Sequence, residues 1–186
     1  PRTIARHLKV EEKVIYSFQE NYCGVKEPGG AFPGIRLWQW WVKAELQRYQ
    51  SLTTLLGRKR VFYGRSYDDS TLREAIAYEP QSVVGDLLNL ALWRVWAYEP
   101  RVQILGQVHD AIVFQYSDNP DTEVEILESC LKFSRIPISA KGRELIIPSE
   151  IQVGWNWSKI SNDNPMGLKK YRAGIPDERR LDRGIS

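Results

Sequence analysis

One His-Asp pair, His109-Asp110, stands between two apolar runs and is the chain's strongest candidate for chemistry. The flanking residues within 102–116 are rich in β-branched and aromatic types, which favour strands. The pattern predicts a two-stranded hairpin with Asp110 at its tight turn, where a divalent metal could reach the carboxylate. Mg²⁺ takes one or two protein carboxylates and fills its shell with water and phosphate oxygens. Asp110 is therefore a candidate for half of a phosphoryl-transfer metal site.

The same pair also has a simpler interpretation. A His-Asp dipeptide can arise by chance, and an Asp in a turn often hydrogen-bonds to its own backbone. The choice between a catalytic hairpin and an ordinary turn therefore depends on evidence from the neighbouring segments.

Composition sets the broad class of protein. The 186 residues suffice for one large domain or two small ones, and a hydrophobic content of 42% allows a sizeable core. A net charge of +3 permits a nucleic-acid partner without requiring one. Two cysteines, Cys23 and Cys130, are too few for a disulfide framework and lack metal-site spacing, which fits a reducing cytosol. No apolar run approaches the roughly 20 residues of a membrane span.

The first third of the chain predicts helices and one hairpin. Residues 2–21 have helical spacing of apolar positions, and a Gly/Pro-rich loop at 23–31 precedes a helix at about 36–50. The Trp-rich face of that helix, with Trp38 and Trp41, is most simply core packing. Residues 51–64 follow as strand, turn and strand.

Three adjacent cations are expected at the tip of the 51–64 hairpin. They are Arg58, Lys59 and Arg60. Such a cluster suits a phosphate backbone, although a solvated turn is the commoner explanation.

A long helical stretch at 70–97 begins at Ser70-Thr71, where Glu74 is placed for a capping box, and is expected to be interrupted at Glu79-Pro80. Gln81 and Ser82 directly follow the proline and could present polar side chains to a ligand.

Further on we expect an amphipathic helix at 121–133 and a strand at 144–153. The polar tail from Ser158 shows no periodicity and is expected to be poorly packed or to wrap a surface.

Four segments, in this order and spacing, resemble family A DNA polymerases, the DNA polymerase I type, and especially their bacteriophage branch. They are Ile4–Leu8 continuing to Phe32-Pro33-Gly34-Ile35, Thr54–Arg60, Leu72–Asp86 and Gln107–Ala111. The closing Glu150–Trp157 is similar to the end of the family's palm. The resemblance covers about residues 3–157, and the ordered set is far more specific than any one motif.

The resemblance implies an α+β fold: the C-terminal part of a polymerase right hand, with helices of the fingers and an antiparallel palm sheet that carries the catalytic hairpin. On this basis residues 1–66 are the last part of the fingers. Residues 67–157 are the palm, and residues 158–186 are a polar C-terminal tail. Because the chain opens at Pro1 already inside a helical pattern, we expect a piece of a longer protein.

The function implied by the resemblance is addition of deoxynucleotides to a primer 3′ end by two-metal-ion nucleotidyl transfer. Asp110 would be one of two metal-binding aspartates, sharing two Mg²⁺ ions with an aspartate not found here. His109 would lie near the primer 3′ end, and Arg73 and Gln81 would touch DNA near the insertion site. The cations at 58–60 would help to position primer and template.

Two positions depart from the family pattern. Ala111 stands where many members have Glu, and Ala77 stands where many have a DNA-contacting Asn. The first metal aspartate and the nucleotide-binding helix are expected upstream of Pro1. We therefore expect the chain to be inactive without an N-terminal polymerase half, beside primer–template DNA and dNTP, in the cytoplasm of a bacterium or phage-infected cell.

Three other protein classes share parts of this pattern. A single-subunit RNA polymerase shares the His-Asp palm motif, but the Pro-Gln-Ser helix and the closing segment argue against it. A non-catalytic module that binds DNA or a partner stays open. A metal-dependent hydrolase needs more ligands than two His can supply.

Overall fold

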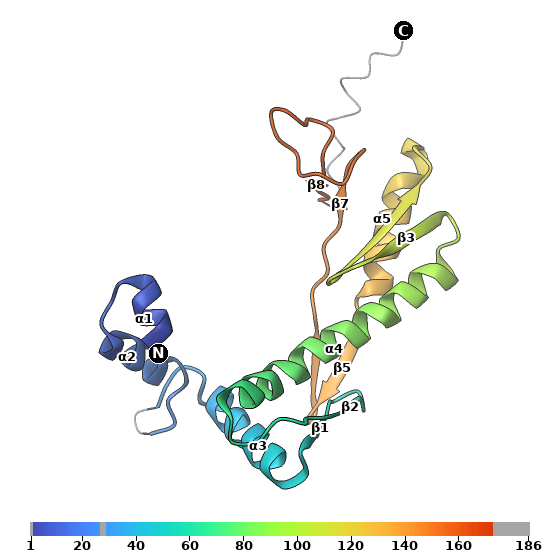
Figure 1. The fold of residues 1–186 in the computed structure, drawn as a ribbon. Helices are drawn as coiled ribbons and strands as arrows, with labels where there is room; N and C mark the ends of the chain where they lie inside the picture. Colours follow the sequence, from blue (N-terminus) through green and yellow to red (C-terminus); the bar gives the residue numbers. More distant parts are fainter. Residues whose placement is uncertain (1, 27–28, 173–186) are drawn as a thin grey trace. The chain divides into compact units, whose positions relative to one another are not determined.

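The computed structural model describes residues 2–26 and 29–172, and its helices and short antiparallel strands confirm the expected α+β class (Figure 1). The helices are α1 (Arg2–Leu8), α2 (Glu12–Cys23), α3 (Pro33–Tyr49), α4 (Asp69–Tyr98) and α5 (Pro120–Ser134). The strands are β1 (Ser51–Thr53), β2 (Lys59–Val61), β3 (Val102–Val108), β4 (Ala111–Tyr116), β5 (Pro137–Ala140), β6 (Arg143–Ile146), β7 (Gln152–Val153) and β8 (Lys169–Lys170).

The chain divides into two compact units between Val83 and Val84. The boundary falls inside α4, which is one continuous helix. Each described strand pairs with its neighbour in a two-stranded antiparallel ladder: β1 with β2, β3 with β4, β5 with β6, and β7 with β8. Within the described residues, no helix is long and apolar enough to cross a membrane.

The helical stretch predicted over 2–21 is split into α1 and α2 at Lys9. Lys9 has a left-handed backbone, with φ of 55°. Its N–H donates to the carbonyl of Arg6 at 3.3 Å, and the N–H of Val10 donates to that of Ala5 at 3.0 Å. These two bonds form a Schellman-type helix end, which usually carries Gly. A lysine gives no such signal in the sequence, so the break was not predicted.

The core of the first unit is where α3, the β1–β2 hairpin and the first turns of α4 meet. Its buried residues are Val42, Leu46, Leu52, Phe62, Ala75 and Tyr78. Trp38 packs against this cluster and donates its indole N–H to Glu79 at 3.0 Å. Trp41, by contrast, is 45% exposed. Core packing of the Trp-rich face therefore holds for Trp38 and is wrong for Trp41.

The β1–β2 hairpin turns earlier than expected. Gly57 has φ of 86°, and its N–H donates to the carbonyl of Thr54 at 2.9 Å. The Thr54 hydroxyl also accepts from the N–H of Arg58 at 3.1 Å. The turn thus lies at 54–58, because Gly57 can adopt the left-handed conformation without steric cost. Lys59 and Arg60 stand in β2 rather than at the tip, which corrects the predicted position of the cations.

The interruption predicted at Glu79-Pro80 is wrong: α4 continues through Pro80. A proline inside a helix removes one backbone hydrogen bond and crowds the preceding turn. Side chains are buried on both sides of it, with Tyr78 before and Val83 and Leu87 after. This burial outweighs the local preference of proline to end a helix.

The core of the second unit forms where the β3–β4 hairpin packs on α5 and the last turns of α4. Val95, Ile126 and Cys130 are its fully buried members. Val102, Ile104, Phe114, Tyr116, Phe133 and Ile151 pack against them. The hairpin expected at 102–116 and the helix expected at 121–133 are both confirmed. Asn119 caps α5, its side chain accepting from the N–H of Asp121 at 3.0 Å.

The C-terminal region is more ordered than its composition suggested. The strand expected at 144–153 is two separate strands, β6 and β7, since Pro148 between them has no N–H for a ladder. Residues 158–172 of the tail fold back, so that β8 pairs with β7 and Tyr171 donates its hydroxyl to Glu128 at 3.0 Å. Apart from Gly167, residues 158–172 are exposed or half-buried, so this part of the tail lies along the surface, which is one of the two arrangements expected, and the remaining tail, 173–186, lies outside the described residues.

Candidate functional site

The predicted catalytic pair occupies the two-residue turn of the β3–β4 hairpin. Val108 and Ala111 are the last paired residues of the ladder, so His109 and Asp110 alone connect the strands. His109 has φ of 52°, a conformation uncommon for residues other than glycine. Both side chains belong to exposed residues. The turn thus carries an imidazole and a carboxylate on adjacent residues at the tip of a short, paired hairpin.

A β-bulge divides this hairpin into a packed base and an exposed tip. Ile104 pairs with Phe114, whereas Gly106 pairs with Val113, which leaves Leu105 as the extra residue. Ile104 and Phe114 pack in the core of the second unit, but Leu105 is exposed. Bulges bend and twist a strand, and they are common beside active sites. This one separates the strand ends that anchor the hairpin from the turn that carries the candidate chemistry.

An ion-pair cluster holds the first residues of the hairpin to α5. Glu99 is only 2% exposed, and Arg101 donates to both of its carboxylate oxygens, at 2.6 and 2.7 Å. The same guanidinium reaches Glu125 of α5 at 2.9 Å. The hydrogen bonds from Arg101 hold the pKa of Glu99 below its ordinary value, against the opposing effect of burial.

This cluster was not predicted from the sequence. Glu99-Pro100-Arg101 has the composition of a solvated turn. Cys130 lies in the same core, and burial raises the pKa of its thiol to about 12, which makes it an inert packing residue. A Glu directly after a long apolar helix and two residues before an Arg was the one available signal.

Asp110 has no hydrogen-bond or ion-pair partner within the described part of the chain, and the same is true of His109. An exposed carboxylate of this kind matches the one or two protein carboxylates that Mg²⁺ takes. Residues 2–26 and 29–172 hold no group of three or more His, Cys, Asp or Glu placed to bind a metal. The donor set thus fits a contribution to a metal site that is shared with ligands from elsewhere.

The predicted DNA-contacting residues gather in the first unit. Arg60 forms an ion pair with Glu74 and lies over the rings of Phe62 and Tyr78, 5.0 and 5.6 Å from their centroids. Tyr78 donates its hydroxyl to the carbonyl of Arg58 at 3.0 Å. These contacts hold the β1–β2 hairpin against the first turns of α4.

Arg73 and Gln81 are exposed on that same part of α4, and Lys59 is exposed on β2. The structure thus brings the cations of the hairpin to the helix that carries Arg73. His109 and Asp110 belong to the other unit.

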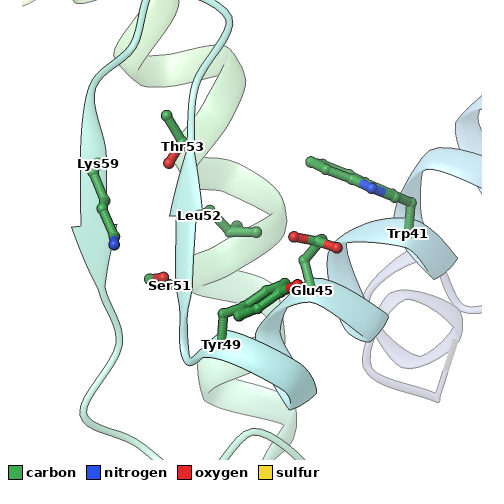
Figure 2. Close-up of a pocket in the computed structure, with 7 residues that line it drawn as sticks. All are labelled: Trp41, Glu45, Tyr49, Ser51, Leu52, Thr53 and Lys59. Carbon is green, nitrogen blue, oxygen red and sulfur yellow. The ribbon is translucent and has the colours of Figure 1, made fainter.

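A surface pocket of about 340 Å³ lies between α3 and the β1–β2 hairpin. Figure 2 shows its lining: Trp41, Glu45, Tyr49, Ser51, Leu52, Thr53 and Lys59. No local sequence pattern groups these residues. They come together only because the hairpin folds back onto α3.

Comparison with known proteins finds relatives that are all named DNA polymerase I. The chain is 30% identical over 127 residues to DNA polymerase I of Helicobacter pylori strain ATCC 700392 / 26695, which covers 63% of this chain and 14% of that protein. It is 29% identical over 167 residues to DNA polymerase I of Treponema pallidum, covering 83% of this chain and 15% of that protein. The chain thus spans about one seventh of the length of these curated relatives. No protein-family model matches it.

The fold has a counterpart among solved structures. The POL domain of Pol1 from M. smegmatis, in complex with DNA primer-template and dNTP, superimposes with a TM-score of 0.57. The match covers 76% of this chain and 26% of that one, at 23% identity, and so concerns the fold alone. The polymerase I relatives and this shared fold together confirm the resemblance to the DNA polymerase I type, whereas the bacteriophage branch stays a prediction: the chain is related to the family A DNA polymerases.

Proposed function

We propose that this chain is part of a DNA-directed DNA polymerase that adds deoxynucleotides to a primer 3′ end. The observation that carries the proposal is the unpartnered Asp110 carboxylate, beside His109, at the tip of a tight hairpin in a relative of DNA polymerase I. An exposed carboxylate without a protein partner is an available anionic ligand. A paired two-strand hairpin is rigid enough to hold it in one place.

In this proposal Asp110 is a metal ligand and His109 faces the primer end. Two bound Mg²⁺ ions would supply charge stabilisation for nucleotidyl transfer. The chain's own contribution is to hold the Asp110 carboxylate in a fixed position. The two-residue turn aims the carboxylate, the core residues of β3 and β4 fix the hairpin, and the pairing of Glu99 with Arg101 fixes its first residues.

Primer–template DNA and dNTP are the proposed ligands. The M. smegmatis structure holds both, which supports the same ligand classes here. Arg73, Gln81 and Lys59 are exposed and have no hydrogen-bond or ion-pair partner among the residues described, so they are available to DNA. Arg58 and Arg60 also interact within the protein, and their contribution would be a positive potential beside the strand.

We further propose that an N-terminal polymerase half, in the same polypeptide or in a second one, completes the site. That half would supply the second metal aspartate and the helix that holds the triphosphate. Leu90, Trp93 and Trp96 lie three residues apart on one side of α4, and Trp93 and Trp96 are 48% and 68% exposed. Large exposed apolar side chains grouped in this way commonly mark a surface that another protein covers.

Replacement of Asp110 by Asn tests the proposal. The amide keeps the size of the side chain but cannot replace a carboxylate as a bridging metal ligand, so we expect loss of primer extension with DNA affinity nearly unchanged. Extension is measured with Mg²⁺, for the chain alone and with the upstream half of a family A polymerase added. Asp163→Asn, at another exposed aspartate of the second unit, is the matched control.

The outcomes separate the alternatives. Near-normal turnover in Asp110→Asn would remove Asp110 from the metal site. Extension by the 186-residue chain alone would contradict the requirement for a second half. Tight DNA binding with no extension in any combination would favour a non-catalytic DNA-binding module.

A further inference from the structure

The pocket between α3 and the β1–β2 hairpin combines aromatic and hydrogen-bonding groups. Trp41, Glu45 and Tyr49 are four residues apart in turn, so they form one stripe along α3. In Figure 2 the Glu45 carboxylate lies between the indole of Trp41 and the ring of Tyr49. Leu52 of β1 is buried and supplies an apolar wall. The pocket thus has flat apolar surfaces with one hydrogen-bond acceptor between them.

The polar groups of this pocket are not used by the rest of the described chain. Glu45 is half-buried and forms no hydrogen bond or ion pair with any described residue. The indole N–H of Trp41 and the amine of Lys59 are likewise unpaired in the described part. A half-buried carboxylate without a protein partner is available to accept hydrogen bonds from a ligand.

We propose that this pocket binds one unpaired nucleobase of single-stranded DNA. The inference rests on the proposed polymerase function and names a site for the strand beyond the primer terminus. Aromatic side chains that stack bases beside cations that meet phosphates are the usual means of binding single strands. A volume of about 340 Å³ is at the small end of the range for ligand sites, as expected for a single planar group.

The charges around the pocket suit a nucleotide rather than a free base. The Arg48 guanidinium lies over the Tyr49 ring, 5.1 Å from its centroid, and Lys59 is on the opposite side of the view from Trp41. Both cations can meet the phosphates that flank a bound base. Glu45 is the one anion in the lining, and in the view of Figure 2 its carboxylate lies between the two rings.

Glu45 also makes the site selective. A carboxylate accepts hydrogen bonds from the exocyclic amino groups of cytosine and adenine and from the paired N–H donors of guanine. Thymine has a single N–H between two carbonyl oxygens, which would face the negative charge. We therefore expect a base that carries an amino group to bind more tightly than thymine.

The first experiment measures how a single-stranded overhang contributes to affinity. The whole 186-residue chain is titrated by fluorescence anisotropy with a blunt duplex and with the same duplex carrying a short 5′ overhang. Trp41→Ala should weaken binding of the overhang DNA by about five-fold or more and leave the blunt duplex unchanged, because one stacking contact is lost. Trp41→Phe should restore most of the affinity. Trp40→Ala is the matched control, since Trp40 is 52% exposed on the same helix and does not line the pocket.

The second experiment replaces each overhang base in turn by thymine. One position should lose affinity on the change to thymine, and Glu45→Gln should remove that preference, since an amide can both donate and accept. Equal affinities of Trp41→Ala and the parent chain for the overhang, or a thymine penalty that survives in Glu45→Gln, would overturn the inference while the polymerase proposal stands. Failure to bind either DNA would contradict both.

Discussion

Removing Arg101 should destabilise the protein more than removing the glutamate to which it is bound. Glu99 is 2% exposed and receives two charge-assisted hydrogen bonds from Arg101. In Arg101→Ala this carboxylate stays buried and loses its countercharge. In Glu99→Ala the buried charge itself disappears, and Arg101 keeps Glu125 and partial contact with water.

The expected losses of unfolding free energy in the two variants follow from the burial of each side chain. Breaking a buried ion pair by removing one partner costs about 3–5 kcal/mol. The Arg101 side chain is 36% exposed, so water screens the pair and the cost of Arg101→Ala should fall below this range while still exceeding that of Glu99→Ala. Glu99→Ala loses hydrogen bonds without leaving a buried charge and should cost about 1–2 kcal/mol.

The difference in stability between the parent and Arg101→Ala should depend on pH. Arg101 lowers the pKa of Glu99 in the folded state, so the pair stabilises the protein above the ordinary value of 4.5 and loses this effect as pH falls through the lowered pKa. In Arg101→Ala the backbone N–H of residue 101 and Ser129 still donate to Glu99, but the countercharge is lost. The pKa of Glu99 should therefore be higher than in the parent, and protonation then relieves the destabilisation. The gap between the parent and Arg101→Ala should therefore narrow on acidification below about pH 5.

Urea unfolding followed by circular dichroism, at neutral pH and at intervals down to acid, measures these differences. Lys170→Ala is the control, because Lys170 pairs with Glu150 at 2.5 Å where both side chains are more than half exposed, and less than about 1 kcal/mol is expected. Equal destabilisation by Glu99→Ala and Arg101→Ala, or a difference between parent and Arg101→Ala that is the same at all pH values, would contradict this prediction.

Three further predictions concern the tip of the hairpin, α4 and the first helix break. Ala111→Glu, which restores the family's second carboxylate, should change primer extension by the assembled enzyme less than about ten-fold; a large gain would show that the natural site is impaired. Arg73→Ala should weaken primer–template binding and lower its salt slope by about one, whereas Gln81→Ala should reduce incorporation more than affinity; unchanged binding and incorporation would make both plain helix residues. Lys9→Gly should raise the free energy of unfolding by up to about 1 kcal/mol, because glycine adopts the left-handed conformation without strain; a loss of stability in urea unfolding would refute this.

Several features of the fold follow from local pattern alone. The β3–β4 hairpin was predictable because its strands are adjacent in sequence, rich in strand-forming residues and separated by one polar pair. Helix α5 was predictable because its apolar positions recur at helical spacing after Asn119 and Pro120. For the same reason the sequence placed Asp110 at a hairpin tip, and its ordered motifs were enough to identify the polymerase family.

Other features depend on contacts between segments that no local pattern encodes. Continuity of α4 through Pro80 depends on side chains that are buried on both sides of the proline. The end of α1 at Lys9 could not be predicted, because no glycine stands at the left-handed position. Glu99 and Arg101 look like a solvated turn until α5 brings Glu125 to them. Trp41 and Lys59 line one pocket only because the β1–β2 hairpin folds back onto α3. The sequence by itself determined the β3–β4 hairpin, helix α5 and the family that its ordered motifs resemble, since these rest on short-range spacing. The tertiary structure decided which charges are buried, which cations are held and where a pocket opens, because burial is set by residues distant in the chain.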